Sequence, residues 1–197
     1  MEKWIIFLFL GSTLNCWAYQ AQTGQVNAFF GPFFHKTDYE NSKIFQDDRW
    51  SGGFGLLVTV DLHEKAALEL SIFHFYKTFF REFENRLLAE RTGFLHLSMG
   101  YRRYLTEKWS TSVTFTSSYT MEKLRKVYSN YLPSDDRPTS ASDITEYGFD
   151  LALQYEIWSR LEEAVVLDGR YHISVTNKVK EYGNHYGFYL AYRRLIK

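Results

Sequence analysis

The fold is decided by one stretch of the chain, Tyr147-Gly148-Phe149-Asp150-Leu151-Ala152-Leu153-Gln154-Tyr155-Glu156-Ile157. Its odd-numbered positions carry aromatic or aliphatic side chains, whereas its even-numbered positions carry glycine, alanine or polar side chains. Successive side chains of a β-strand point to opposite faces, so the stretch predicts a strand with one apolar and one polar face. Tyrosines lie near both ends of the apolar face, with aliphatic side chains between them. This gradient is typical of a strand that crosses a lipid bilayer.

The same alternation recurs along the rest of the chain and predicts eight strands. The expected strands cover residues 24–34, 53–62, 68–77, 93–104, 109–121, 147–157, 164–176 and 185–194. The connections between them alternate between long and short, and strands joined by a short connection pair antiparallel. The pattern therefore predicts an all-β fold, an eight-stranded antiparallel up-and-down barrel with all its long loops at one end.

Alternation alone leaves the direction of the apolar face open. A soluble carrier barrel of the lipocalin type points this face inward around a ligand, whereas a membrane barrel points it outward to lipid. Aromatic residues at both ends of the apolar face, small or hydroxyl side chains on the polar face, and short turns opposite long loops favour the membrane barrel. In these features the chain resembles the family of small eight-stranded outer-membrane β-barrels. The resemblance implies a monomeric transmembrane β-barrel in the outer membrane, with outer-membrane lipid around it.

Composition and the first residues narrow the class further. The 197 residues suit one domain, and a formal net charge of zero predicts no binding to nucleic acid. No run of 18 apolar residues occurs, which excludes a spanning helix. Residues 1–18 have the features of a secretory signal peptide, with Lys3 before an apolar stretch and Ala18 at the expected cleavage site. We therefore expect residues 19–197 to form the barrel domain, without the single cysteine, Cys16, and without a disulfide.

Charged side chains on the polar face are expected to pair, because an isolated buried charge is costly. If each hairpin is centred on its turn, Asp150 lies opposite Arg170, and Glu69 lies opposite Arg102. Both pairs combine opposite charges on the lumen side. The sequence thus predicts a plugged interior held by ion pairs and no open pore.

One short motif is a candidate for catalysis. His172 and Ser174 lie on the same face of the seventh expected strand, and a histidine beside a serine is the minimum for an activated nucleophile. The expected register places Glu146 opposite Ser174, where a carboxylate would orient the histidine. The alternative is that these side chains are ordinary polar residues of the lumen.

The stretch 172–195 is similar to the end of the lipid A deacylase family, eight-stranded outer-membrane barrels with a His-x-Ser-Asn motif on the seventh strand. The resemblance implies that His172 acts as the base and Ser174 as the nucleophile. Val175 stands where the family has its asparagine, and no acid stands at the start of the next strand, where Glu181 is the nearest. A lumenal direction of the two side chains would also separate them from lipid of the outer leaflet.

Apart from His172 and Ser174, the long loops are the candidate functional parts of the chain. The other histidines show no metal-ligand spacing, and phosphate-binding glycine loops and paired-cysteine motifs are absent, so we expect no metal and no cofactor. The long loops 35–50, 78–92 and 122–144 are mixed in charge and are candidate contacts for a surface partner. The expected function is a structural or surface-interaction role. Lipid A deacylation is the alternative, and a soluble carrier barrel is the third.

Overall fold

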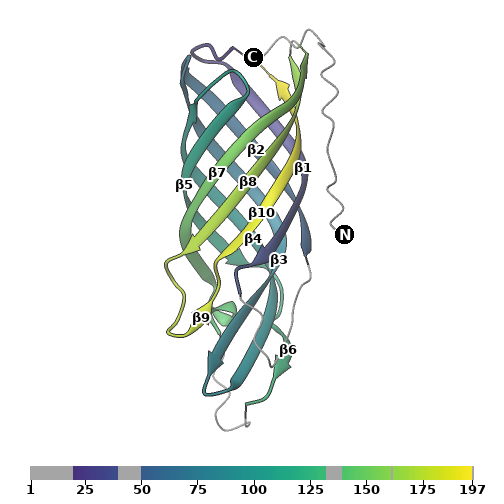
Figure 1. Ribbon diagram of the computed structural model, residues 1–197, viewed down its shortest axis with the longest axis vertical. Helices are drawn as coiled ribbons and strands as arrows, with labels where there is room; N and C mark the ends of the chain where they lie inside the picture. Colours follow the sequence, from purple (N-terminus) through teal and green to yellow (C-terminus); the bar gives the residue numbers. More distant parts are fainter. Residues whose placement is uncertain (1–19, 40–49, 132–138, 161, 197) are drawn as a thin grey trace, which may run out of the picture.

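The structure, a computed structural model, describes residues 20–39, 50–131, 139–160 and 162–196. It consists of a β-barrel that is prolonged at one end, as Figure 1 shows. Among the described residues, no helix is long and apolar enough to cross a membrane. The expected signal peptide, residues 1–18, lies outside the described residues, as does Cys16.

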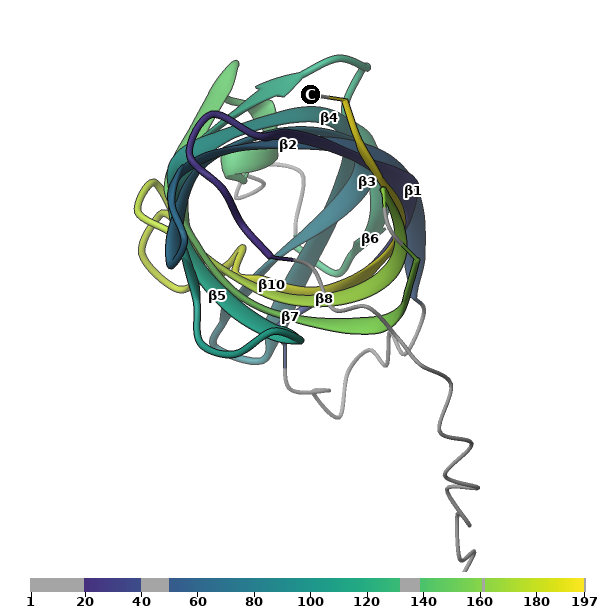
Figure 2. The same cartoon turned by 90° about the horizontal axis from the view of Figure 1, so that it is seen from above.

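Eight antiparallel strands form the wall of the barrel. They are β1 (Val26–Thr37), β2 (Ser51–His63), β3 (Ala66–Phe83), β4 (Arg86–Tyr104), β5 (Trp109–Thr120), β7 (Thr145–Arg160), β8 (Glu163–Ser174) and β10 (His185–Leu195). Each wall strand pairs with the next along the chain, and β10 pairs back with β1, so the wall closes into the ring seen from above in Figure 2. Closure leaves no free strand edge in the wall. The predicted antiparallel up-and-down barrel is thereby confirmed.

The apolar face of the wall points outward. Leu151 and Leu153 of β7 are 44% and 49% exposed, whereas Asp150 and Ala152, which alternate with them, are 3% and 4% exposed. On β5, Phe115 is exposed and its neighbour Thr114 is buried. An apolar exterior around a polar interior is the arrangement of a barrel that spans a membrane. The lipocalin-type carrier barrel requires the opposite orientation, so this third alternative is wrong.

The lumen is filled by two kinds of side chain. Apolar side chains from β1, β2, β3, β8 and β10 form one buried cluster: Phe29, Phe33, Leu57, Phe73, Phe75, Ala164, Val166, Tyr189 and Ala191. The ring centroid of Phe33 lies 5.1 Å from that of Phe73 and 5.5 Å from that of Phe75. The face that the sequence predicts to be rich in small and hydroxyl side chains therefore also carries large aromatic ones. The other part of the lumen carries the charged side chains described below.

Strands β3 and β4 continue past the wall as one long hairpin. Two short strands are added to its edges, β9 (Glu181–Tyr182) beside β3 and β6 (Arg125–Ser129) beside β4. Residues 77–92 of the hairpin, together with β6, β9 and the 3-10 turn η1 (Ser140–Ser142), are called the extension (Figure 1). The expectation of a loop over 78–92 is thus wrong. The expected loop 122–144 contains β6 and η1, and β9 lies between the last two expected strands.

The extension has packed side chains on both faces of its hairpin. One face carries Tyr39, Phe80, Leu87 and Ala89, with the ring of Tyr128 against them. The opposite face carries Phe79, Phe94 and Ala141. Because both faces are covered by protein, the sequence here shows no alternation of apolar and polar residues. This explains why the pattern that predicts the wall does not predict the extension.

The hairpin reverses direction in a two-residue turn. Phe83 pairs with Arg86, and between them Glu84 and Asn85 have φ angles of 48° and 62°. Two successive residues with positive φ match the twist of antiparallel strands, and Asn-Gly is the sequence that favours such a turn. Neither residue is glycine, so the usual sequence signal for a tight hairpin is missing at this position.

Candidate functional site

The larger network of charged side chains in the lumen is organised around Arg102, which is fully buried on β4. Its Nε donates to Glu69 Oε2 on β3 at 2.7 Å, and its Nη2 donates to Asp168 Oδ2 on β8 at 2.9 Å. Nη1 donates to Ser110 Oγ at 2.7 Å and to Gln154. One guanidinium therefore ties β3, β4, β5, β7 and β8 together across the lumen.

Arg170 of β8 extends this network toward the other polar groups. Its Nη2 donates to Glu69 Oε1 at 2.8 Å, its Nε lies 2.8 Å from Asp168 Oδ1, and its Nη1 lies 3.7 Å from Asp150 Oδ2. Its guanidinium carbon stands 5.1 Å from the ring centroid of Phe73. Arg170 thus lies between the ion-pair network and the aromatic cluster, and it contacts both groups of lumenal side chains.

The strand register differs from the prediction by two residues in both hairpins. Asp150 pairs with His172 and not with Arg170, and Glu69 pairs with Gly100 and not with Arg102. Each turn lies at a different place from the one assumed, and the β7–β8 pairing also shifts at a bulge before residue 158. A shift of two residues keeps each side chain on its face. The arginine side chains are long enough to reach the carboxylates diagonally, so the structure brings the expected partners together in spite of the shift.

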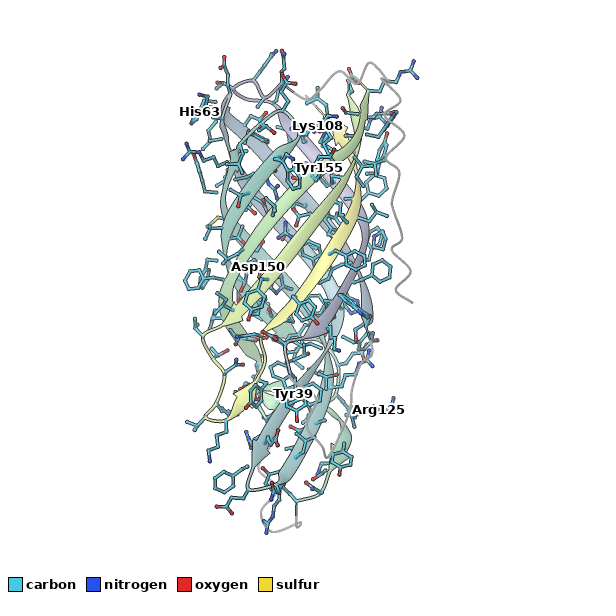
Figure 3. The ribbon with its side chains drawn as sticks, in the orientation of Figure 1. Tyr39, His63, Lys108, Arg125, Asp150 and Tyr155 are labelled. Carbon is cyan, nitrogen blue, oxygen red and sulfur yellow. The ribbon has the colours of Figure 1, made fainter. Side chains whose placement is uncertain are left out.

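A second polar group lies nearer the extension, on the lumen side of β3, β4, β7 and β8. His172 Nδ1 lies 2.8 Å from Asp150 Oδ1, and His96 Nε2 lies 3.1 Å from Asp150 Oδ2. Lys77 Nζ donates to both oxygens of Glu146, at 2.6 and 2.8 Å. All five side chains are buried. Figure 3 marks the level of Asp150, between the short turns at His63 and Lys108 and the extension near Tyr39 and Arg125.

The structure does not bring together the side chains of the catalytic motif. His172 faces Asp150 and Glu146, and among the described residues no hydrogen bond joins its ring to Ser174. The Ser174 hydroxyl lies 3.4 Å from Thr176 Oγ1, and Gly148 takes the position opposite Ser174 that was expected for Glu146. His172 is buried on the lumen face of the wall and does not face the lipid side.

Glu181 has a structural environment of its own in the extension. Its carboxylate accepts hydrogen bonds from Ser140 N at 2.6 Å, Ser140 Oγ at 2.5 Å and Lys178 N at 2.8 Å. Glu90 of β4 accepts in the same way from Thr139 N and Thr139 Oγ1, both at 2.7 Å. The two glutamates hold η1 against the hairpin from two sides, which makes the expected loop 122–144 an ordered part of the extension where it is described.

Sequence reasoning missed two features of this site. Lys77 falls on the polar face of the expected strand 68–77, and no partner is assigned to it from the sequence, although a lone buried cation requires a carboxylate nearby. His35, His96, His172 and His185 come from four strands that are distant in sequence, so no spacing rule links them. Their common signal is only that each occupies a position on the lumen face of its strand.

Fold, lumen and exterior together define a class: a small eight-stranded transmembrane β-barrel of the outer-membrane type. The chain is similar in structure to Ail, the attachment invasion locus protein of Yersinia pestis, solved in complex with the heparin analogue sucrose octasulfate. The TM-score is 0.53 and the identity 14%, over 87% of this chain and 99% of Ail. It is also similar to the outer membrane protein OprG from Pseudomonas aeruginosa, with a TM-score of 0.54 and 10% identity over 88% of this chain and 97% of OprG. No family model matches the chain, and no curated protein matches it in sequence. At these identities the likeness establishes the fold.

Proposed function

We propose that this chain is an integral protein of the outer membrane whose barrel is closed to diffusion and whose extension contacts partners outside the cell. The observation that carries the proposal is the extension itself, a folded protein surface raised beyond the wall. In barrels of this kind, short turns face the periplasm and long connections face outward. The extension lies at the end with the long connections (Figure 1).

The closed lumen is supported by the way in which its interior is filled. Arg102 bridges five wall strands through ionic and neutral contacts, and the aromatic cluster around Phe33 and Phe73 fills the neighbouring part. An eight-stranded barrel has an interior only wide enough for side chains, so a filling of this kind supports a lumen closed to water-filled conduction. The proposal thus retains the plugged interior expected from the sequence.

A role in surface contact is supported by the order of the extension. A connection that only solvates the rim needs no buried apolar cluster, whereas this one buries Phe80 and Leu87 and anchors η1 through Glu90 and Glu181. Rigid presentation lowers the entropic cost of binding.

Shortening the hairpin tests the surface role. Lys77 pairs with Thr92, so residues 78–91 can be replaced by an Asn-Gly turn that closes the hairpin at the rim. The matched control keeps the extension and places Asn-Gly at positions 84 and 85. Cells carrying equal amounts of folded barrel are then tested on immobilised matrix proteins and glycans, with heparin included because Ail is seen with a heparin analogue.

We expect cells with the full protein and with the control turn to adhere to at least one of these surfaces. Cells with the shortened hairpin should adhere no better than cells without the protein. Equal adhesion of the full and shortened proteins on every surface would remove the surface role. Conductance of planar bilayers tests the closed lumen separately: the proposal requires no steady single-channel current from the purified protein, and large steady currents would contradict it.

A further inference from the structure

Four of the six histidines gather inside the lumen. They are His35 on β1, His96 on β4, His172 on β8 and His185 on β10, and all are buried. The ring of His172 lies 4.6 Å from that of His185 and 5.4 Å from that of His96, measured between centroids. The ring of His35 lies 5.3 Å from that of His185. Four imidazoles on four separate strands are thus held within one small region, next to the carboxylate of Asp150.

Three of these groups present ligand atoms to a common point. One ligand atom each from His96, Asp150 and His172 can be chosen so that all three lie within 4.8 Å of one another. Imidazole nitrogen and carboxylate oxygen are the ligands that zinc and related divalent transition metals prefer. From this geometry we infer that His96, Asp150 and His172 form a binding site for a divalent transition-metal ion of the zinc type. The inference does not depend on the proposed surface role.

The groups behind the two histidines fit this assignment. A metal-bound histidine donates its other ring N–H to a nearby acceptor, which fixes its tautomer. The second nitrogen of His96, Nδ1, lies 2.7 Å from Ser118 Oγ. The second nitrogen of His172, Nε2, lies 3.6 Å from Glu146 Oε1, and Glu146 is itself held by Lys77. Ser118 is therefore within hydrogen-bonding distance of His96, whereas the Glu146 carboxylate lies beside His172 but beyond hydrogen-bonding distance of its Nε2.

Proton balance permits the exchange of ligands. Without metal, the neutral rings of His96 and His172 can each donate one N–H to the Asp150 carboxylate. When the metal binds, it takes those two nitrogens and a carboxylate oxygen, and each ring carries its single proton on the other nitrogen. These protons then point to Ser118 and Glu146, so no proton needs to leave the neutral site.

The backbone beside the site leaves room for the ring of His172. A Cβ added to Gly148 would lie 2.5 Å from His172 Cε1 and 2.8 Å from His172 Nε2. Glycine at this position of β7 lets the imidazole lie directly against the strand. His185 stacks on the ring of His172, and its buried Nδ1 has no hydrogen-bond partner among the described residues. The ring of His185 is thus a further imidazole beside the ligand His172.

The charges around the site favour a cation. The connected polar groups of the lumen include four carboxylates, from Glu69, Glu146, Asp150 and Asp168. They include three cationic side chains, from Lys77, Arg102 and Arg170. With neutral histidines one negative charge is in excess, and Asp150 has the longest contact to a cationic side chain, 3.7 Å to Arg170 Nη1. A metal ion between Asp150 and the two histidines would lie next to this least compensated carboxylate.

Zinc binding by the full-length barrel tests the inference. The protein is refolded into detergent with a chelator, or with Zn²⁺ present so that the metal enters before the lumen closes, and bound zinc is measured after gel filtration. We expect about one zinc per chain by the metal stoichiometry of such sites. Cobalt refolded in place of zinc should give the visible absorption bands of a four-coordinate or five-coordinate ion with nitrogen and oxygen ligands.

Matched substitutions separate the site from adventitious binding. His96→Gln and His172→Gln should each lower zinc affinity by about 100-fold or more, since loss of even a supporting residue costs 10- to 100-fold. His74→Gln makes the same change on the exposed face of β3 and should leave binding unchanged. Asp150→Asn keeps the shape of the side chain, and its zinc binding is measured instead if a histidine variant fails to fold. The inference would be overturned if the folded wild type held no stoichiometric zinc, or if it retained no more zinc than the His96→Gln/His172→Gln double variant. An equal loss of zinc in His74→Gln would also overturn it.

Discussion

Strands β3 and β4 pass through two different surroundings along one uninterrupted hairpin. Between the short turn before Ala66 and Phe75, β3 has one exposed face, which carries Leu70 and Ile72, and one face buried in the lumen, which carries Glu69 and Phe73. Beyond Lys77 both faces pack against other parts of the protein. The same backbone ladder therefore serves a wall with an outer lipid face and an extension without one.

The two regions are held together by different forces. The lumen relies on ion pairs that cross from strand to strand, so that removal of one charged group leaves its buried partners less compensated. The extension relies on apolar contacts and on hydrogen bonds that anchor η1, which are local to it. We therefore expect damage in the lumen to unfold the whole barrel, and damage in the extension to remain there.

The largest effect is expected for Arg102→Met. The substitution keeps much of the side-chain volume but leaves Glu69 and Asp168 with less compensation, and removal of one partner of a buried ion pair costs about 3–5 kcal/mol. The free energy of unfolding of the whole barrel, measured by urea titration in detergent or lipid vesicles, should fall by this amount. The heat-modifiable shift of the folded band on gels should move to lower temperature.

Arg103→Met is the matched control, because Arg103 is the exposed neighbour on the same strand. It should change the unfolding free energy by less than about 0.5 kcal/mol, as surface substitutions usually do. An equal loss in both variants would mean that the lumenal charges are not what distinguishes the wall. Restoration of stability in a variant that also replaces Asp168 by Asn would identify the uncompensated carboxylate as the cause.

A smaller and local effect is expected for Leu87→Ala in the extension. Leu87 is fully buried beside Phe80 and Tyr39, and such a truncation costs about 2–4 kcal/mol where the cavity does not collapse. Because the contacts of Leu87 lie outside the wall, limited proteolysis should cut the hairpin sooner while the folded barrel band survives. Leu124→Ala, at an exposed position, should leave the cleavage rate unchanged. If Leu87→Ala led to loss of the folded barrel band together with cleavage of the hairpin, the two regions would not be independent.

The contrast between the regions also explains how far the sequence could predict the fold. In the wall, the lipid side of each strand requires apolar side chains and the lumen side accepts polar ones. An alternation with a period of two is therefore visible in stretches such as 147–157. In the extension, Phe79 and Phe80 are both buried on opposite faces, and the turn at Glu84 and Asn85 lacks glycine. Neither alternation nor turn chemistry was present there to indicate a hairpin.

The candidate site was predictable in kind but not in register. Asp150, Arg170, Glu69 and Arg102 could be assigned to the lumen from the alternation, because a face does not change when pairing slips by two residues. Their exact neighbours depend on turn positions and on the bulge in β7, which periodicity does not locate. The gathering of four histidines depends on ring closure between distant strands, so no local spacing could have shown it.

A modest effect is expected for Glu90→Gln, which tests the anchoring of η1. The carboxylate of Glu90 accepts two short hydrogen bonds from Thr139, and an amide in its place loses the charge that strengthens them. We expect local protection of the backbone amides near Thr139 to fall by about 1 kcal/mol in hydrogen exchange. Exchange of the wall amides should stay unchanged. Glu64→Gln, in an exposed turn at the opposite end, is the control and should alter neither.

The smallest effect is expected at the tip of the hairpin, where the replacement of Glu84 by Asn and Asn85 by Gly should stabilise the extension. Both residues have positive φ, which costs an L-residue such as glutamate free energy that asparagine and glycine avoid. The gain is limited to about 0.5–1 kcal/mol, because glycine also loses more backbone entropy on folding. Slower proteolysis of the hairpin at unchanged barrel stability is the expected result. Lys65→Gly, in a turn residue whose φ is not positive, should bring no gain, and an equal gain there would show that glycine acts through something other than the left-handed backbone of this turn.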